Sequence, residues 1–134
     1  MTIDWIFNCN TRYLTNAYDN NTYNYRFSLR PGIHAADLFL TFLDVKIDWQ
    51  GKRRVVNVPY ARAWQSYLVS FIKHGNPNVQ RREETIRWET AGEAIRIVDL
   101  RWEGFKWVED DQVDAERCAF WQKAEYAPYW NSSA

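Results

Sequence analysis

Hydrophobic positions in the first part of the chain recur with two different periods. From Thr2 or Asp4, either of which can cap a helix, they recur at helical spacing as far as Ala17, and the polar run 19–21 ends this predicted helix. Its recurring positions are Ile3, Ile6, Phe7, Asn10, Tyr13, Leu14 and Ala17. The next segment, 22–29, alternates strictly and predicts a β-strand. Its alternating positions are Tyr23, Tyr25, Phe27 and Leu29.

The rest of the chain alternates between helical and extended patterns. A short helix is predicted over 35–43, and a polar connector over 46–54 follows it. The longest helix begins after Asn57 as N-cap, has Pro59 in its first turn and ends at Gly75. Its apolar stripe is Ala61, Trp64, Leu68, Phe71 and Ile72. Beyond a loop over 75–84, two short strands are predicted at 95–100 and 105–108, and a final helix at 111–127 with Val113, Phe120, Trp121 and Ala124 on one face.

Length and charge narrow the class of protein. A chain of 134 residues is long enough for a real core. Its 17 basic and 17 acidic residues balance and form no basic stripe, which disfavours nucleic-acid binding. No apolar run reaches the roughly 18 to 20 residues of a membrane span, and the first 30 residues lack the apolar core of a signal peptide. The aromatic content of 17% predicts large core residues rather than a sugar-stacking surface.

Several kinds of chemical site are missing from the sequence. The glycines are too far apart for a dinucleotide or phosphate loop, so no cofactor is expected. No serine has glycine two positions to either side, which excludes a G-x-S-x-G nucleophile elbow within these residues. The two histidines and two cysteines have no zinc spacing, so no metal is expected. His74 fits a favourable place at a helix C-terminus.

His34 is the candidate for chemistry. It follows the predicted strand 22–29 and the turn at Pro31-Gly32, and in open α/β sheets ligands bind beyond the carboxyl ends of strands. From the residues alone, both a catalytic and a structural role stay open, because no nucleophile is visible.

Five segments occur in the same order as in the type-B carboxylesterases, the family of the cholinesterases and of secreted fungal lipases and esterases. They are IFNCN at 6–10, NNTYNYRF at 20–27, PGIHAADLFLTF at 31–42, SYLVSFIKHGNPN at 66–78 and ERCAFW at 116–121. The chain resembles the C-terminal part of such an enzyme over nearly its whole length, closest to the fungal branch. The resemblance implies an α/β fold made of the last sheet strands and packing helices of an α/β-hydrolase. Residues 1–134 are then part of a larger domain and incomplete on their own.

The resemblance assigns roles to residues of the predicted turn. His34 falls on the catalytic histidine, the general base that takes the serine proton and returns it to the leaving alcohol. Asp37 falls on an acidic position that supports the histidine loop without being the triad acid. At Ala35 the family usually has glycine, which we attribute to close backbone, so this residue departs from the pattern.

The resemblance also implies features of a secreted protein. Cys9 and Cys118 fall on a pair that forms a disulfide in cholinesterases, and this disulfide would tie the first helix to the last. Asn20 lies in a glycosylation sequon that cholinesterases share, and Asn131 begins a second one. We therefore expect the parent protein to be extracellular, although these residues include no signal peptide.

The family resemblance predicts ester hydrolysis by a larger protein. The triad of α/β-hydrolases appears in the order serine, acid, histidine, so the nucleophile, the acid and the oxyanion hole would lie upstream of Met1. The complete enzyme would act on a carboxylic ester or lipid, and the isolated chain would be inactive. The alternative is part of a non-catalytic, cholinesterase-like binding or adhesion protein. Retention of His34 favours the esterase.

Overall fold

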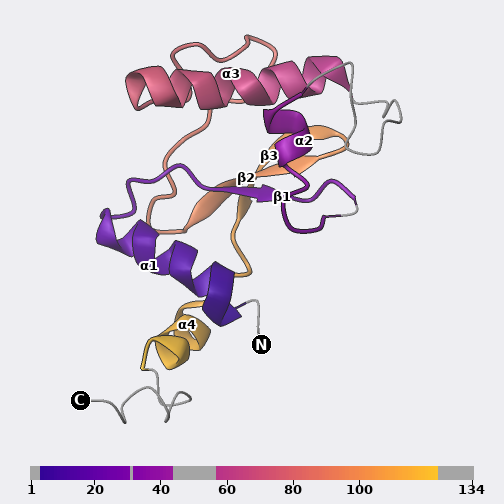
Figure 1. Ribbon diagram of the computed structural model, residues 1–134. Helices are drawn as coiled ribbons and strands as arrows, with labels where there is room; N and C mark the ends of the chain where they lie inside the picture. Colours follow the sequence, from indigo (N-terminus) through magenta and orange to yellow (C-terminus); the bar gives the residue numbers. More distant parts are fainter. Residues whose placement is uncertain (1–3, 31, 44–56, 124–134) are drawn as a thin grey trace, which may run out of the picture. The chain divides into compact units, whose positions relative to one another are not determined.

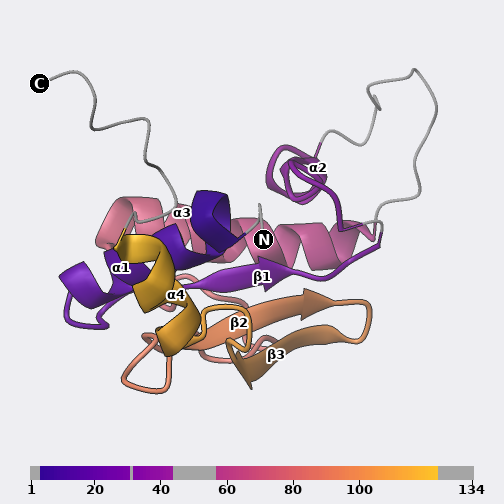
Figure 2. The same cartoon turned by 90° about the horizontal axis from the view of Figure 1, so that it is seen from below.

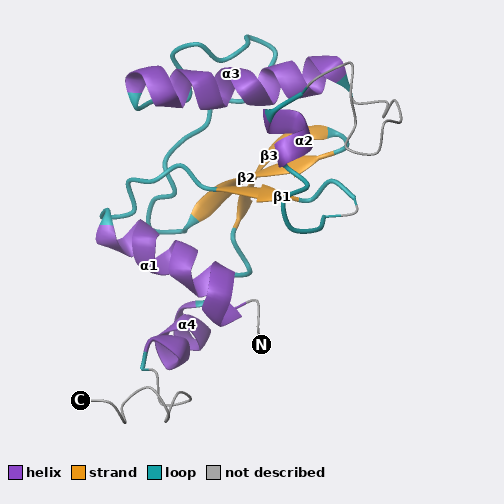
Figure 3. Ribbon diagram, viewed as in Figure 1, coloured by secondary structure: helices purple, strands orange, loops and turns teal. Residues whose placement is uncertain are grey.

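The computed structural model describes residues 4–30, 32–43 and 57–123. Helices and strands alternate along the chain (Figures 1 and 3). The elements are η1 (Asp4–Asn8), α1 (Cys9–Ala17), β1 (Tyr25–Phe27), α2 (Leu38–Thr41), α3 (Val58–His74), β2 (Arg96–Arg101), β3 (Gly104–Glu109) and α4 (Ala115–Gln122). The predicted connector at 46–54 lies outside the described residues.

The chain divides into two compact units, which we name by a feature of each. The disulfide unit takes the described residues of Met1–Asn24, Thr90–Ile97 and Val108–Ala134. The histidine unit takes those of Tyr25–Glu89 and Val98–Trp107.

The three strands form one sheet in the order β1, β2, β3 (Figure 2). β1 and β2 are parallel, with Arg26 opposite Asp99. β2 and β3 are separated by two residues, a connection that permits only an antiparallel hairpin, so the sheet is mixed. Both hairpin strands were predicted within one or two residues. The predicted strand 22–29 is a regular strand only over Tyr25–Phe27.

Helix α3 has the termini that the sequence predicts. The Asn57 side chain accepts a hydrogen bond of 3.2 Å from the Tyr60 backbone N–H, which satisfies a donor of the first turn. Gly75 ends the helix at φ 65°, the left-handed conformation that glycine adopts without strain. The buried face differs from the predicted stripe: Ala61 and Trp64 are buried, whereas Phe71 and Ile72 are exposed. The residues buried on α3 are Ala61, Ala63, Trp64, Tyr67 and Ser70.

Aromatic side chains make much of the core of the histidine unit. Tyr60 of α3 stacks on Phe105 of β3 with ring centroids 4.6 Å apart. Tyr67 meets Phe105 edge to face at 5.5 Å, and Trp64 lies 5.8 Å from Trp88. The high aromatic content therefore fills a core in this unit, as predicted.

In the disulfide unit, the predicted first helix is divided into a π-helical turn, η1, and the α-helix α1. Of the residues that recur at helical spacing, Ile6, Phe7 and Leu14 are exposed. The buried residues of α1 are Cys9 and Thr15. Periodicity identifies an apolar stripe but not the surface that covers it.

The last helix begins later than predicted. α4 starts at Ala115 because the Asp114 side chain accepts a hydrogen bond of 2.8 Å from the Arg117 backbone N–H and caps it. On the predicted apolar face Val113 is buried and Phe120 is half exposed. Ala124 lies outside the described residues.

Candidate active site around His34

His34 lies beyond the end of β1, as the sequence predicted, and it begins a tight turn. The helix predicted over 35–43 is shorter than expected, since α2 is helical only over Leu38–Thr41. The turn covers 34–37, and α2 follows it at once. The Ala36 N–H donates to the Ile33 carbonyl at 3.1 Å, and the Leu38 N–H donates to the Ala35 carbonyl at 3.2 Å. The His34 side chain is exposed, so its imidazole is accessible to a substrate or to a second catalytic group.

Ala35 has the unusual backbone conformation of this turn. Its φ is 65°, in the left-handed region that costs a residue with a Cβ roughly 1–2 kcal/mol. The family resemblance implies glycine here, and the structure supplies a conformational reason for that preference. The alanine is accommodated, but under strain next to the candidate catalytic residue.

Asp37 is held by β1 and by its own helix. Its Oδ2 accepts a hydrogen bond of 2.8 Å from the Tyr25 hydroxyl. Its carbonyl oxygen accepts 3.0 Å hydrogen bonds from the Thr41 hydroxyl and the Thr41 N–H. These contacts suit the supporting role that the family resemblance implies for Asp37.

Helix α3 fixes the far end of the same turn and helix. Trp64 Nε1 donates to the Thr41 hydroxyl oxygen at 3.0 Å. Gln65 Nε2 donates to the carbonyl oxygens of Leu40 and Thr41, each at 3.1 Å. Figure 1 shows α2 beside the first half of α3. The side chains that hold α2 therefore come from a helix that starts more than a dozen residues later.

A buried charge cluster lies where β1 pairs with β2, and sequence reasoning missed it. Asp99 is fully buried, and its Oδ2 is 3.1 Å from Arg26 Nη2 and 2.7 Å from Arg101 Nε. Burial alone would raise the pKa of Asp99, but hydrogen bonds from Ser28, Arg101 and Arg26 outweigh it and lower that pKa. Asp99 is therefore ionised at neutral pH. Opposite charges in two predicted strands were the available signal, but the pairing register was unknown.

The disulfide unit holds the predicted cysteine pair. Cys9 and Cys118 form a disulfide that joins α1 to α4 across 109 residues of sequence. Beside it, Arg12 donates to the Val113 carbonyl at 2.7 Å, and the Tyr13 hydroxyl donates to the Cys118 carbonyl at 2.5 Å.

Of the two predicted glycosylation sites, Asn20 lies within the described residues. Asn20 follows α1 in the left-handed conformation, at φ 59°, and is only partly exposed, with its Oδ1 buried. Its backbone is paired, since the Gly92 N–H donates to its carbonyl at 3.1 Å. Asn131 lies outside the described residues.

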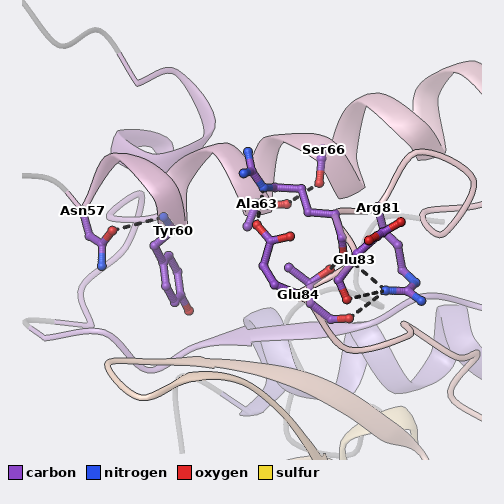
Figure 4. A network of polar contacts seen from close by, with 9 residues as sticks. Asn57, Tyr60, Ala63, Ser66, Arg81, Glu83 and Glu84 are labelled. Carbon is purple, nitrogen blue, oxygen red and sulfur yellow. Dashed lines mark hydrogen bonds and ion pairs between the residues drawn. The ribbon is translucent and has the colours of Figure 1, made fainter.

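A separate cleft of about 320 Å³ lies in the histidine unit between the start of α3, the loop 84–86 and the β2–β3 hairpin. Figure 4 shows polar contacts beside it, with Asn57 capping α3. Arg81 donates to carbonyl oxygens of its own loop, including that of Thr85 at 2.8 Å. Glu84 on the rim is paired with Arg82 at 2.5 Å. Among the described residues, no histidine or serine lines this cleft.

A metal site and a membrane-spanning helix are both absent from the described residues. No group of three or more His, Cys, Asp or Glu residues there could hold a metal ion. Over the same residues, no helix has the length and hydropathy needed to cross a membrane.

Comparisons with known proteins support the sequence resemblance. A secreted lipase of Arthroderma benhamiae is 30% identical over an alignment of 132 residues, which covers 90% of this chain and 24% of the lipase. The carboxylesterase patB of Penicillium expansum is 29% identical, over 88% of this chain and 20% of that enzyme. The chain therefore spans about a fifth to a quarter of the length of these relatives. No family model matches the chain.

A solved structure shows the fold class. The crystal structure of Aspergillus niger EstA superposes with a TM-score of 0.73 over 90% of this chain and 26% of that chain, at 20% sequence identity. The fold is part of an α/β-hydrolase fold, as predicted. Within that class, the predicted resemblance to a portion of the type-B carboxylesterases and lipases is confirmed.

Proposed function

We propose that this chain supplies the catalytic histidine, His34, of a serine carboxylic-ester hydrolase. The observation that carries the proposal is an exposed histidine on a tight turn just beyond the carboxyl end of β1, in a chain similar to lipases and carboxylesterases over about nine-tenths of its length. Reacting groups in open α/β sheets occupy this position.

In the proposed reaction His34 moves one proton twice. It accepts the proton of a serine hydroxyl as the serine oxygen forms a bond to the ester carbonyl carbon. It then gives that proton to the leaving alkoxide as the ester C–O bond breaks, which leaves an acyl-enzyme. In the second half, the same imidazole takes a proton from water as the water oxygen bonds to the acyl carbon. The serine C–O bond then breaks, the imidazole returns that proton to the serine oxygen, and the acid leaves. In this proposal the serine, the triad acid and the oxyanion donors come from parts of the complete enzyme outside this chain.

The substrate class we propose is a carboxylic ester or lipid. Without the other groups of the triad, His34 offers little more than dissolved imidazole, so the isolated chain should hydrolyse an activated ester no faster than its own His34→Ala variant. We also propose that the protein passes through an oxidising compartment and is secreted. The Cys9–Cys118 disulfide supports this, since such bonds persist there, and one relative is named a secreted lipase.

The test is a chimaera of the Arthroderma lipase in which the aligned segment is replaced by this chain. His34→Ala should lower kcat for a short-chain p-nitrophenyl ester by several orders of magnitude, on the order of 10⁶. The matched control is His74→Ala, which removes the other histidine, at the exposed end of α3, and should leave kcat unchanged.

If the chimaera does not fold, the same comparison is made after grafting only residues 32–43 into the lipase. A folded protein whose His34→Ala variant keeps more than about a tenth of the activity would overturn the catalytic assignment. The binding or adhesion role would then take its place.

A further inference from the structure

Tyr25 connects the core of the histidine unit to the turn that carries His34. Its ring centroid lies 4.8 Å from that of Trp64, and it meets Trp88 edge to face at 6.3 Å. The two tryptophans restrict where the ring can lie. Its hydroxyl reaches beyond this cluster and donates to Asp37 Oδ2 at 2.8 Å.

The donor in this hydrogen bond is permanent. Burial, and then the hydrogen bond to Asp37, raise the pKa of Tyr25 above its usual range. The hydroxyl therefore keeps its proton, and stays a donor, throughout the pH range in which an esterase works.

A second route from the same cluster reaches the same residue. Trp64, which packs on the Tyr25 ring, donates from Nε1 to the Thr41 hydroxyl, and that hydroxyl donates to the Asp37 carbonyl oxygen. Asp37 is thus held through its side chain by β1 and through its main chain by α3. Fixing both parts of one residue leaves the turn few ways to shift.

The turn transmits this restraint to His34. Only two residues separate His34 from Asp37, and both lie in the hydrogen-bonded turn. Ala35 already carries backbone strain there, so the turn needs an external restraint to keep its conformation.

We infer that Tyr25 is a positioning residue for His34, and that it acts through the hydrogen bond from its hydroxyl to Asp37. The inference rests on the proposed function of His34. Tyr25 does not touch the reacting atoms. It holds the turn so that the imidazole meets the serine hydroxyl at hydrogen-bonding distance, where misplacement by about 1 Å can cost on the order of 100-fold in rate.

The test uses the active chimaera. Tyr25→Phe removes only the hydroxyl and should lower kcat by about 10- to 100-fold with little change in KM, because substrate binding does not involve this residue. The matched control is Tyr67→Phe. Tyr67 belongs to the same aromatic cluster, 5.4 Å from Trp88, but its hydroxyl donates to the Ile86 carbonyl, away from the histidine turn.

A double-mutant cycle identifies the partner. Asp37→Leu should lower kcat about as much as Tyr25→Phe. The double variant should be no worse than either single variant, because each of the three variants loses the same hydrogen bond between Tyr25 and Asp37. Asp37→Asn, which keeps an acceptor oxygen, should retain most of the activity. Additive losses would overturn the inference.

The results also separate failure of the inference from failure of the proposed function. A normal kcat in Tyr25→Phe, with an inactive His34→Ala, overturns the inference alone. Equal losses in Tyr25→Phe and Tyr67→Phe show a merely structural role and overturn it too. An active His34→Ala variant overturns the proposed function.

If the chimaera is inactive, amide hydrogen exchange of this chain replaces the kinetic measurement. Faster exchange over 33–38 in Tyr25→Phe than in Tyr67→Phe supports the inference, and equal exchange overturns it.

Discussion

Each of the two units is stabilised internally by a different kind of interaction. In the disulfide unit apolar side chains of η1 and α1 are exposed, with Phe7 and Leu14 more than half accessible, and a covalent bond joins α1 to α4. In the histidine unit, aromatic rings from strands and α3 pack on one another, and polar side chains extend from them to the turn. A disulfide joins two elements at one point, whether or not their other faces are buried. Aromatic packing instead restricts the positions of several side chains at once. Only the second kind of support suits a residue that must be placed to within a fraction of an ångström.

Removing the disulfide should give the largest effect on stability. It should also affect the disulfide unit more than the histidine unit. The Cys9→Ala/Cys118→Ala variant releases a loop of 109 residues, which lowers the free energy of unfolding by roughly 4–5 kcal/mol in the chain-entropy model. Chemical denaturation measures the loss, and hydrogen exchange should place it in α1 and α4.

Peptide mapping without reductant is the control for the disulfide, and it should give one cross-linked peptide. Two free thiols in folded, secreted protein would contradict the pairing.

Replacing Asp99 tests the charged part of the histidine unit. Asp99→Asn should lower the free energy of unfolding at pH 7 by about 2–3 kcal/mol, because two arginines lose a buried partner but can still reach water. The control is Glu84→Gln, which breaks an exposed pair with Arg82 and should cost nothing measurable.

Asp99 should also make the free energy of unfolding depend on pH, with a definite sign. Because the folded protein lowers the pKa of Asp99, its contribution is complete above the unfolded value of about 3.9 and is lost as pH falls through the lower folded value. Wild-type stability should therefore fall more steeply than that of Asp99→Asn as the solution is acidified below about pH 4. Parallel curves would show that Asp99 is not the group that titrates.

Ala35→Gly should give the smallest effect, and it is a gain. Relief of roughly 1–2 kcal/mol of left-handed strain exceeds the roughly 0.4–1 kcal/mol of added chain entropy in the unfolded state, leaving about 0.5 kcal/mol. Thermal unfolding measures it. Ala36→Gly is the matched control, since Ala36 is buried and lacks a positive φ, so it should lose stability. A loss in Ala35→Gly would mean that the turn does not adopt this conformation in solution.

The sequence by itself determined the features that depend on neighbouring residues. Asn57 and Gly75 mark the ends of α3 because capping involves residues three or four positions apart. The two strands β2 and β3 and the place of His34 after β1 follow from equally short-range rules.

Only the tertiary structure decided which residues meet across long stretches of chain. Periodicity placed Phe71 and Ile72 on the apolar stripe of α3 and gave Phe7 of η1 helical spacing, but burial depends on which surface covers a helix, and these residues are exposed. The hydroxyl of Tyr25 finds Asp37, and the carboxylate of Asp99 finds Arg26, only once β1 has paired with β2 in one register. The contacts that hold the histidine turn therefore depend on the pairing register of β1 and β2. This register depends in turn on how the aromatic core packs as a whole, which no local sequence pattern encodes.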